Sequence, residues 1–220
     1  TGFAGTTTVT AGTLKGSTAD AFGTSAITVN GGTFDLNALT LANNITFNGG
    51  MLAGGTFAVS QLTATGGTVS ASLSGAGALT KTGAGTLTLS AANDFTGGTT
   101  INGGTLTFAN AVDHLADAGT VTVNTGGTLA LGSLSETVGA VTLAGDTVFR
   151  SSGGSNGSFE LTNTLNLGAN NVSFILDGAN TTNVAGVISG TGSLTKSSTA
   201  PVVLSGVNTY SGGTFLNGGN

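Results

Sequence analysis

The sequence predicts an all-β fold in which the chain coils as a parallel β-helix with rungs of about 17 to 23 residues. Two observations carry this prediction. A corner phrase of Asn, one or two Gly and a Thr recurs along the chain, and short runs of alternating apolar residues flank each copy. The first large apolar residue after each corner also returns at the interval typical of solenoids. This series consists of Leu14, Phe34, Leu52, Val69, Leu87, Leu106, Leu129 and Val148.

The composition is that of a folded repeat array and not of a disordered Gly-rich chain. The 220 residues include 40 Gly but one Pro, and strand-forming residues fill the gaps between corners. Each unit of such an array packs only on its neighbours, so residues 1–220 are expected to form a single array. Both ends of the sequence cut into the repeat, which predicts a fragment of a larger domain.

Residues 26–36 illustrate the expected rung. Ile27 and Val29 face one side of a strand, and Phe34 and Leu36 face the same side after the corner. The Thr that follows each corner then points outward. Asn and Gly tolerate the left-handed backbone that a sharp bend requires. The corner residues identified in this way are Asn30, Gly31, Gly32, Asn48, Gly49, Gly50, Asn102, Gly103, Gly104, Asn124, Gly126 and Gly127.

Two architectures fit this pattern. Asn-Gly between alternating apolar runs is a strong hairpin signal, which favours an antiparallel meander or sandwich. Alternatively, each corner turns the chain through part of a coil, and equivalent residues stack from rung to rung. Stacking places Asn30, Asn48, Asn102 and Asn124 in one column, where side-chain amides form a ladder. The nearly constant rung length favours the coil, because every insertion has to be looped out without shifting the ladder.

A longer motif occurs twice. Residues 75–106 include the segments LTKTGAGTLTLS and NDFTGGTTINGGTL, and residues 190–219 repeat this pattern 115 positions later without a gap. The second copy has Ser-Thr-Ala-Pro at 198–201 in place of Gly-Ala-Gly-Thr at 83–86, and a Pro cannot donate to a strand ladder. The motif resembles the autotransporter-associated β-strand repeat of bacterial passenger domains. At about 19 residues per rung, we expect the two copies to lie about six turns apart.

The resemblance implies a right-handed parallel β-helix at the cell surface of a Gram-negative-type bacterium or secreted from it. It also implies a partner, the C-terminal outer-membrane β-barrel of the same polypeptide, which exports the passenger. We therefore expect a structural stalk or scaffold that presents adhesive or other functional parts and aids passenger folding and secretion. One alternative is an adhesin surface that binds host or sister cells, or its own copies. Another is a carbohydrate-active β-helix enzyme, although we expect no enzyme activity and no cofactor.

The charged residues and short motifs of the sequence predict few binding or catalytic sites. Lys and Arg number four and the net charge is -5, which speaks against nucleic acid as a partner. Asp113, His114 and Asp117 are a weak surface-loop candidate for a divalent metal, but an Asp in such a loop more often closes a turn. The other carboxylates are spread almost one per rung, so no paired-carboxylate site is predicted. Lys81 follows a Gly-rich stretch but lacks the helix of a phosphate-binding loop.

Overall fold

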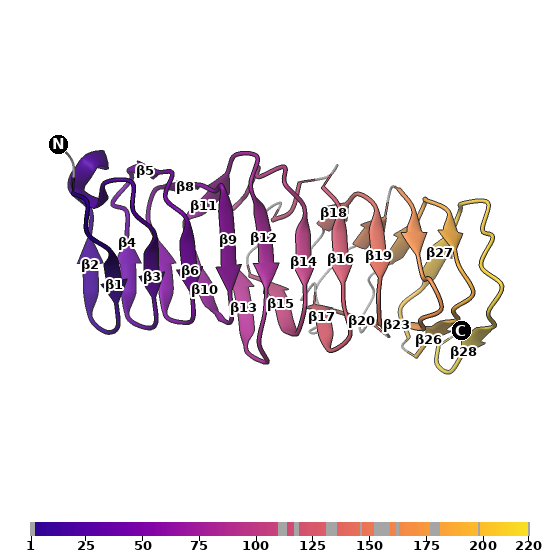
Figure 1. Cartoon of the computed structure of the whole chain (residues 1–220). Helices are drawn as coiled ribbons and strands as arrows, with labels where there is room; N and C mark the ends of the chain where they lie inside the picture. The colour runs from indigo at the N-terminus through magenta and orange to yellow at the C-terminus, as the bar shows by residue number, and fades with distance from the viewer. Residues whose placement is uncertain are drawn as a thin grey trace.

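The computed structural model describes residues 3–109, 114–116, 119–130, 136–145, 147–151, 159–161, 163–176, 181–197 and 199–219. In these residues the chain forms a β-solenoid that fits a right-handed parallel β-helix, and the helical content is one short 3-10 helix, η1 (Ala19–Phe22). Figure 1 shows an elongated coil with successive strands side by side along its axis. Across the same ranges, the search for a helix long and apolar enough to cross a membrane finds none.

The strands form two long sheets and two short ones. Sheet 1 has ten strands: β1 (Thr7–Val9), β3 (Ile27–Val29), β6 (Ile45–Phe47), β9 (Gln61–Ala64), β12 (Ala78–Lys81), β14 (Thr99–Ile101), β16 (Val121–Val123), β19 (Val141–Leu143), β22 (Leu165–Asn166) and β25 (Ile188–Ser189). Sheet 2 has eleven strands: β2 (Thr13–Lys15), β4 (Thr33–Asp35), β7 (Met51–Ala53), β10 (Gly67–Val69), β13 (Thr86–Leu89), β15 (Gly104–Phe108), β17 (Gly127–Ala130), β20 (Thr147–Ser151), β23 (Val172–Leu176), β26 (Leu194–Lys196) and β28 (Thr214–Leu216). Sheet 3 contains β5 (Thr40–Leu41), β8 (Thr56–Ala58) and β11 (Ser72–Ser74), and sheet 4 contains β18 (Glu136–Val138), β21 (Phe159–Leu161), β24 (Thr182–Val184) and β27 (Val202–Leu204).

The chain visits sheet 1, then sheet 2, then a third side of the coil where sheets 3 and 4 lie, before it returns to sheet 1. Every strand pair among the described residues is parallel. This pairing excludes the antiparallel meander or sandwich. The spacing between partners in sheet 1 runs from 17 residues (Ile45 to Leu62) to 24 residues (Val141 to Leu165), close to the predicted rung length.

The core is built from side chains that alternate inward along each short strand. In β3, Ile27 and Val29 are completely buried, whereas Thr28 between them is partly exposed. Burial of each such apolar side chain contributes about 1.5–3 kcal/mol, so stability accumulates rung by rung. The two inward columns of sheet 1 are Ile27, Ile45, Leu62, Leu79, Thr99, Val121, Val141, Leu165 and Ile188, and Val29, Phe47, Ala64, Lys81, Ile101, Val123 and Leu143.

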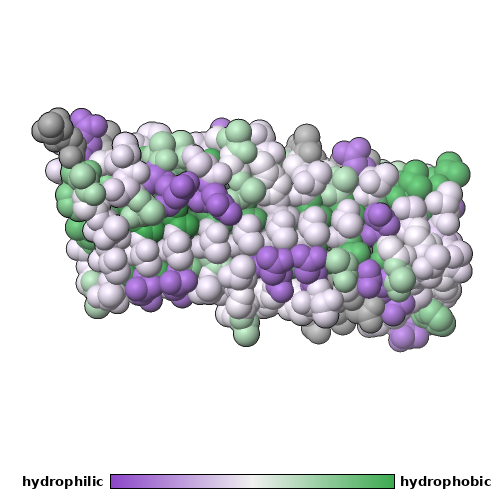
Figure 2. All heavy atoms as spheres, in the orientation of Figure 1, coloured by the Kyte–Doolittle hydropathy of each residue, from purple (hydrophilic) through white to green (hydrophobic). Residues whose placement is uncertain are grey.

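The outward side of sheet 1 carries a continuous threonine column. Its members stand in register on eight successive strands and are followed by Asn166 and Ser189. Figure 2 shows this face as a largely pale surface of near-neutral hydropathy, with hydrophilic patches both above and below the pale rows. The threonine column consists of Thr8, Thr28, Thr46, Thr63, Thr80, Thr100, Thr122 and Thr142.

The members of the predicted apolar series whose side chains are described belong to one continuous core, but in sheet 2 the series is divided between two columns. Strand β10 begins at its corner glycine, Gly67, whereas β13 begins after the corner, and Leu87 stands opposite Gly67. The first large apolar residue after a corner thus marks different places in short and long rungs. One column contains Leu14, Phe34, Leu52, Val69, Leu89 and Phe108, the other contains Leu87, Leu106, Leu129 and Phe149, and Val148 lies one residue out of register.

A left-handed turn leads from sheet 2 to sheet 3 in the second rung. Asn37 and Ala38 have φ values of 50° and 65°, which is unusual for residues with a side chain. The carboxylate of Asp35 holds this turn, since its Oδ1 accepts the Asn37 N–H at 2.8 Å and its Oδ2 lies 3.3 Å from the Lys15 ammonium. These contacts, the Asn37 hydrogen bond foremost, lower the pKa of Asp35 below its ordinary value of 3.8.

Replacing Asp35 with Asn is expected to remove a pH-dependent part of the stability. Because the pKa of Asp35 is lower in the folded state, its contribution is present above pH 3.8 and is lost as the pH falls through the folded-state pKa. The free energies of unfolding of the two proteins should therefore converge in acid and separate above pH 3.8. Lys15→Met serves as the control, and a larger effect from it than from Asp35→Asn would contradict the leading role of the Asn37 hydrogen bond.

Replacing Ala38 with Gly is expected to stabilise the protein by about 0.5–1 kcal/mol. A left-handed conformation costs an L-residue about 1–2 kcal/mol, and the larger unfolded-state entropy of Gly offsets part of the gain. The next rung already makes its turn with Gly54 and Gly55, at φ values of 60° and 68°. Chemical denaturation measures the change, and Gly55→Ala should shift the stability in the opposite direction.

Candidate functional site

The predicted corner asparagines share one corner of the coil. Their backbone N–H groups donate to residues of the preceding rung in the inward column of sheet 1. The side chains form two ladders, since Asn48 Nδ2 donates to Asn30 Oδ1 at 2.8 Å and Asn124 Nδ2 donates to Asn102 Oδ1 at 2.5 Å. Thr65 and Thr82 occupy the same corner between the two pairs, where their N–H groups donate to Phe47 and Ala64, so the amide ladder is interrupted.

The predicted corner glycines are required mainly for their backbone conformation and for close approach of the rungs. Gly32 has a φ of 68°, and a Cβ added there would lie 2.5 Å from the Gly12 carbonyl oxygen. A side chain at this position would separate two successive rungs. Positive φ values are also found at Gly49, Gly50, Gly104 and Gly126, whereas Gly31, Gly103 and Gly127 have ordinary φ values.

The surface-loop candidate is divided by the structure. Asp113 and Asp117 lie outside the described residues. His114 is completely buried, and its ring stacks on Phe108 with a centroid distance of 4.8 Å. Its Nε2 lies 3.0 Å from the Ala109 carbonyl oxygen. His114 therefore packs inside the coil and does not project from it, and the described residues contain no group of three metal-ligating side chains.

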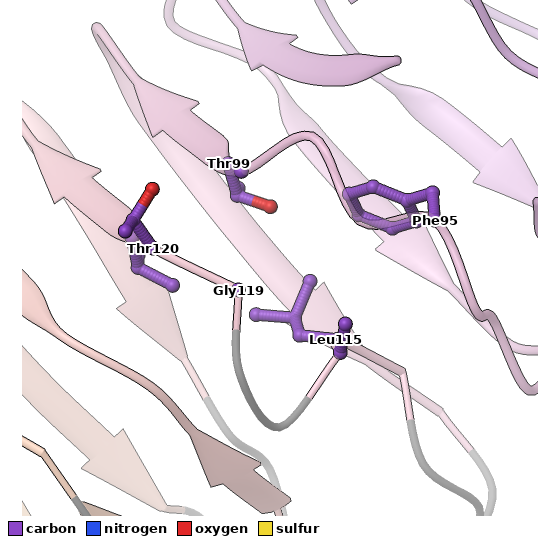
Figure 3. Close-up of a pocket in the computed structure, with 8 residues that line it drawn as sticks. Phe95, Thr99, Leu115, Gly119 and Thr120 are labelled. Atoms are coloured by element: carbon purple, nitrogen blue, oxygen red, sulfur yellow. The ribbon is translucent and has the colours of Figure 1, made fainter. Parts of the chain in front are cut away.

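A small cavity lies on the third side of the coil, between β13 and β16. Figure 3 shows the side chains of Phe95 and Leu115 at this cavity, beside Thr99, Gly119 and Thr120. Its volume of about 10 Å³ is at the limit for one water molecule. The cavity is a packing gap where the third side has no strand, and it has no room for an organic ligand.

A buried lysine closes the corner between sheets 1 and 2. Lys81 is completely buried and stands in the inward column of sheet 1 between Ala64 and Ile101. Its Nζ donates to the carbonyl oxygens of Thr82 (2.6 Å), Gly83 (2.9 Å) and Gly103 (3.0 Å). An ammonium has three donors, so all of them are satisfied, and they join the corners of two successive rungs. Burial lowers the pKa of Lys81 below its ordinary value of 10.5.

A buried asparagine replaces a missing strand on the third side of the coil. Asn93, only 8% exposed, follows β13 in a rung where the third side has no strand. Its Oδ1 accepts the Leu73 N–H at 2.8 Å and its Nδ2 donates to the His114 carbonyl oxygen at 2.9 Å. The side-chain amide thus acts as a peptide group between two rungs and satisfies backbone groups that a strand would otherwise pair.

Comparison with known families matches three segments of the chain, residues 1–15, 79–108 and 189–220, to the passenger-associated-transport-repeat. These three segments are similar to that repeat. The match confirms the resemblance to the autotransporter passenger repeat, and together with the solenoid it fits an autotransporter passenger scaffold. No curated protein and no solved structure gives a significant match to the chain.

The two longer passenger-associated-transport-repeats share two side-chain contacts at positions 115 residues apart. Asn208, the equivalent of Asn93, accepts the Ile188 N–H at 2.9 Å through Oδ1. Lys196, the equivalent of Lys81, is 6% exposed and donates to the Gly218 carbonyl oxygen at 2.8 Å. The lysine and the asparagine are therefore parts of the repeat itself and not accidents of one rung.

The passenger-associated-transport-repeat does not mark a fixed side of the coil. Strand β12 lies in sheet 1, whereas its equivalent β26 lies in sheet 2. From β12, sheet 1 passes through β14, β16, β19 and β22 to β25, which is five turns, and β26 follows one side later. The expected separation of six turns was wrong, because the rungs between the copies reach 24 residues, as between Val141 and Leu165.

The sequence predicts where the repeat lies, but the structural role of its lysine and asparagine was missed. A polar residue at an inward-facing position, at the same place in both copies, was the signal that could have indicated this role. Lys81 is two residues after Leu79, and Lys196 is two residues after Leu194. Alternation assigns such a lysine to the core, where it needs hydrogen-bond partners.

Proposed function

We propose that the chain is a structural stalk of an autotransporter-like surface protein, which holds adhesive or other functional parts away from the cell. The observation that carries the proposal is the continuous register of its long sheets. Ten steps between the eleven strands of sheet 2, at about 4.8 Å each, extend about 50 Å. The passenger-associated-transport-repeat supports this assignment, since its family implies a cell-surface or secreted protein joined to a C-terminal translocator barrel.

The stalk proposal is tested by removing one complete turn. Deletion of residues 45–61 joins Asn44 to Leu62 and keeps the register of the strands on both sides, because Ile45 and Leu62 are partners. In the full-length protein on cells, we expect this variant to reach the surface and to differ only in length. Deletion of residues 45–53 removes β6 and β7 but leaves β8, and we expect it to abolish display, measured by antibody labelling of intact cells. Equal display of both variants would contradict the role of the continuous coil.

A second candidate function is adhesion between copies of the chain, favoured by the threonine column of sheet 1. In the described part of the chain, no hydrogen bond occupies the hydroxyl groups of this column, and uncharged side chains make up the whole column. Sedimentation of the purified chain at increasing concentration tests this candidate. The combined substitutions Thr63→Lys, Thr80→Lys and Thr100→Lys should abolish concentration-dependent association. The control substitutions Thr88→Lys and Thr107→Lys, on sheet 2, should leave it unchanged. A wild-type chain that stays monomeric at high concentration would exclude this candidate.

The proposed stalk has no catalytic role. Residues 30–32, 48–50, 102–104 and 124–127 act as corners, and the residues that define the repeat satisfy backbone groups. Release of reducing sugars from a polysaccharide, abolished by substitution of one carboxylate, would support the alternative of a carbohydrate-active enzyme and contradict this proposal.

A further inference from the structure

A shallow groove lies on the third side of the coil, where sheet 3 ends. Its volume is about 520 Å³, and its lining includes Thr40 of β5, Thr56 of β8 and Ser72 of β11. These three residues are in register on successive rungs, so their hydroxyl groups form a row along the coil axis at steps of about 4.8 Å. Ser74 and Asp94 also contribute polar side chains to the lining. Figure 1 shows β5, β8 and β11 in sequence along the upper edge of the coil.

The polar groups of the groove are available for a ligand. Among the described residues, no hydrogen bond uses the hydroxyl groups of Thr40, Thr56, Ser72 and Ser74 or the carboxylate of Asp94. Asn93 also lines the groove, but both of its amide atoms are engaged in the bridge between Leu73 and His114. The groove therefore presents four hydroxyl groups and one exposed carboxylate above a floor that is already satisfied.

Asp94 is not needed for the fold of the repeat. Its backbone N–H donates to the Leu73 carbonyl oxygen at 2.9 Å, and in the other copy Thr209 makes the same bond to Ile188 at 2.8 Å. The side chain at this position thus differs between two copies with the same backbone contacts. The carboxylate at 94 is therefore not required for the backbone contacts of the repeat.

We propose that this groove binds a neutral, extended glycan that lies along the coil axis. Hydroxyl groups both donate and accept, so a row of them matches successive sugar rings of a linear chain. The Asp94 carboxylate accepts hydrogen bonds from two adjacent hydroxyl groups of one ring, and such charge-assisted bonds are stronger than neutral ones. An acidic glycan is disfavoured, because Asp94 and the net charge of -5 repel it. This proposal goes beyond the stalk function, which stands if the groove binds nothing.

The test is a titration of the chain with linear hexasaccharides, followed through the amide NMR signals of residues 40, 56, 72, 74 and 94. The neutral probes are hexamers of β-1,4-linked glucose, β-1,3-linked glucose and β-1,4-linked N-acetylglucosamine, and the acidic probe is a hexamer of galacturonate. For a shallow groove we expect a neutral probe to bind with a dissociation constant of about 1 mM. Asp94→Thr, which installs the residue of the other repeat copy, should weaken binding about tenfold.

The matched control is Asp20→Thr, which removes another exposed carboxylate from a segment outside the groove. Saturable shifts confined to the groove, lost in Asp94→Thr and kept in Asp20→Thr, support the proposal. Three results would overturn it: no saturable shift with any neutral probe, equal binding by Asp94→Thr, or tighter binding of galacturonate. Because Asp94→Thr retains the contacts of the repeat, hydrogen exchange at Leu73 should be unchanged, which separates loss of binding from loss of structure.

Discussion

Replacement of Asn93 by Ala is expected to lower the free energy of unfolding by about 3 kcal/mol. Asn93 satisfies the Leu73 N–H and the His114 carbonyl group, and Leu73 and His114 are 1% and 0% exposed. Truncation leaves two buried polar groups without partners, and each costs about 1–3 kcal/mol. Urea unfolding measures the loss, and hydrogen exchange of the Leu73 amide reports it locally.

Two variants separate the bridge from simple loss of volume. Asn93→Asp keeps an acceptor for the Leu73 N–H but loses the donor to His114, and protonation of the carboxyl group restores a donor. Relative to the wild type at the same pH, this variant should recover in acid. Asn208→Ala should cost less, since Asn208 is only half-buried and makes its bond to Ile188. An Asn93→Ala protein with unaltered exchange at Leu73 would refute the bridge.

The sequence predicts those parts of the fold that local rules determine. The alternation of Ile27, Thr28 and Val29 assigns two side chains to the core and one to the surface, and the structure confirms this. Gly32 follows from the need for a left-handed corner. The parallel coil itself was one of two open alternatives, because Asn-Gly corners suit a hairpin as well as a rung.

The register between rungs was less accessible, because it depends on residues that are distant in the sequence. Leu87 stands opposite Gly67 and not opposite Val69, and only the pairing of β10 with β13 shows this. A local rule that takes the first apolar residue after a corner cannot detect that the corners of two successive rungs lie at different positions in the register. The same limit explains the misjudged separation of the two repeat copies, since longer rungs change the number of turns.

The polar residues of the repeat were missed for a different reason. A lysine is usually a surface residue, and Lys81 was considered only as part of a phosphate-binding loop. Its burial depends on three carbonyl oxygens, of which that of Gly103 belongs to the next rung. His114 presents the converse case, because a histidine between aspartates indicates a surface loop, whereas its ring stacks on Phe108 in the core.

Replacement of Lys81 by Ala is expected to destabilise the protein by about 3–4 kcal/mol. The substitution removes three buried methylene groups, worth about 0.8 kcal/mol each, and leaves a cavity between Ala64 and Ile101. It also removes the three hydrogen bonds that join the corner of Thr82 and Gly83 to that of the next rung. Chemical denaturation measures the total.

Lys81→Met separates the side-chain stem from the ammonium. Met keeps most of the volume, and the carbonyl oxygens that lose their donor lie at a corner where Gly83 is exposed and Thr82 is half-buried, so water replaces the ammonium there. The substitution also removes a buried charge, which offsets part of the lost hydrogen bonding. We therefore expect Lys81→Met to cost less than about 1.5 kcal/mol. An equal cost for Met and Ala would assign the whole effect to the ammonium.

The pH dependence of the Lys81→Met comparison gives an independent test of the buried charge. Burial lowers the pKa of Lys81 in the folded state, so between that pKa and the ordinary value of 10.5 the unfolded chain binds more protons than the folded one. Stability from this group therefore rises with pH across that window, in contrast to a lysine in an ion pair, whose contribution falls. The wild type should gain stability relative to Lys81→Met as the pH approaches 10.5. The two proteins differ at position 81 alone, so the difference between their free energies of unfolding isolates this side chain. If the difference between the two free energies of unfolding stays constant across this pH range, burial of the ammonium carries no net cost. In that case the three carbonyl oxygens stabilise the charge as well as water does.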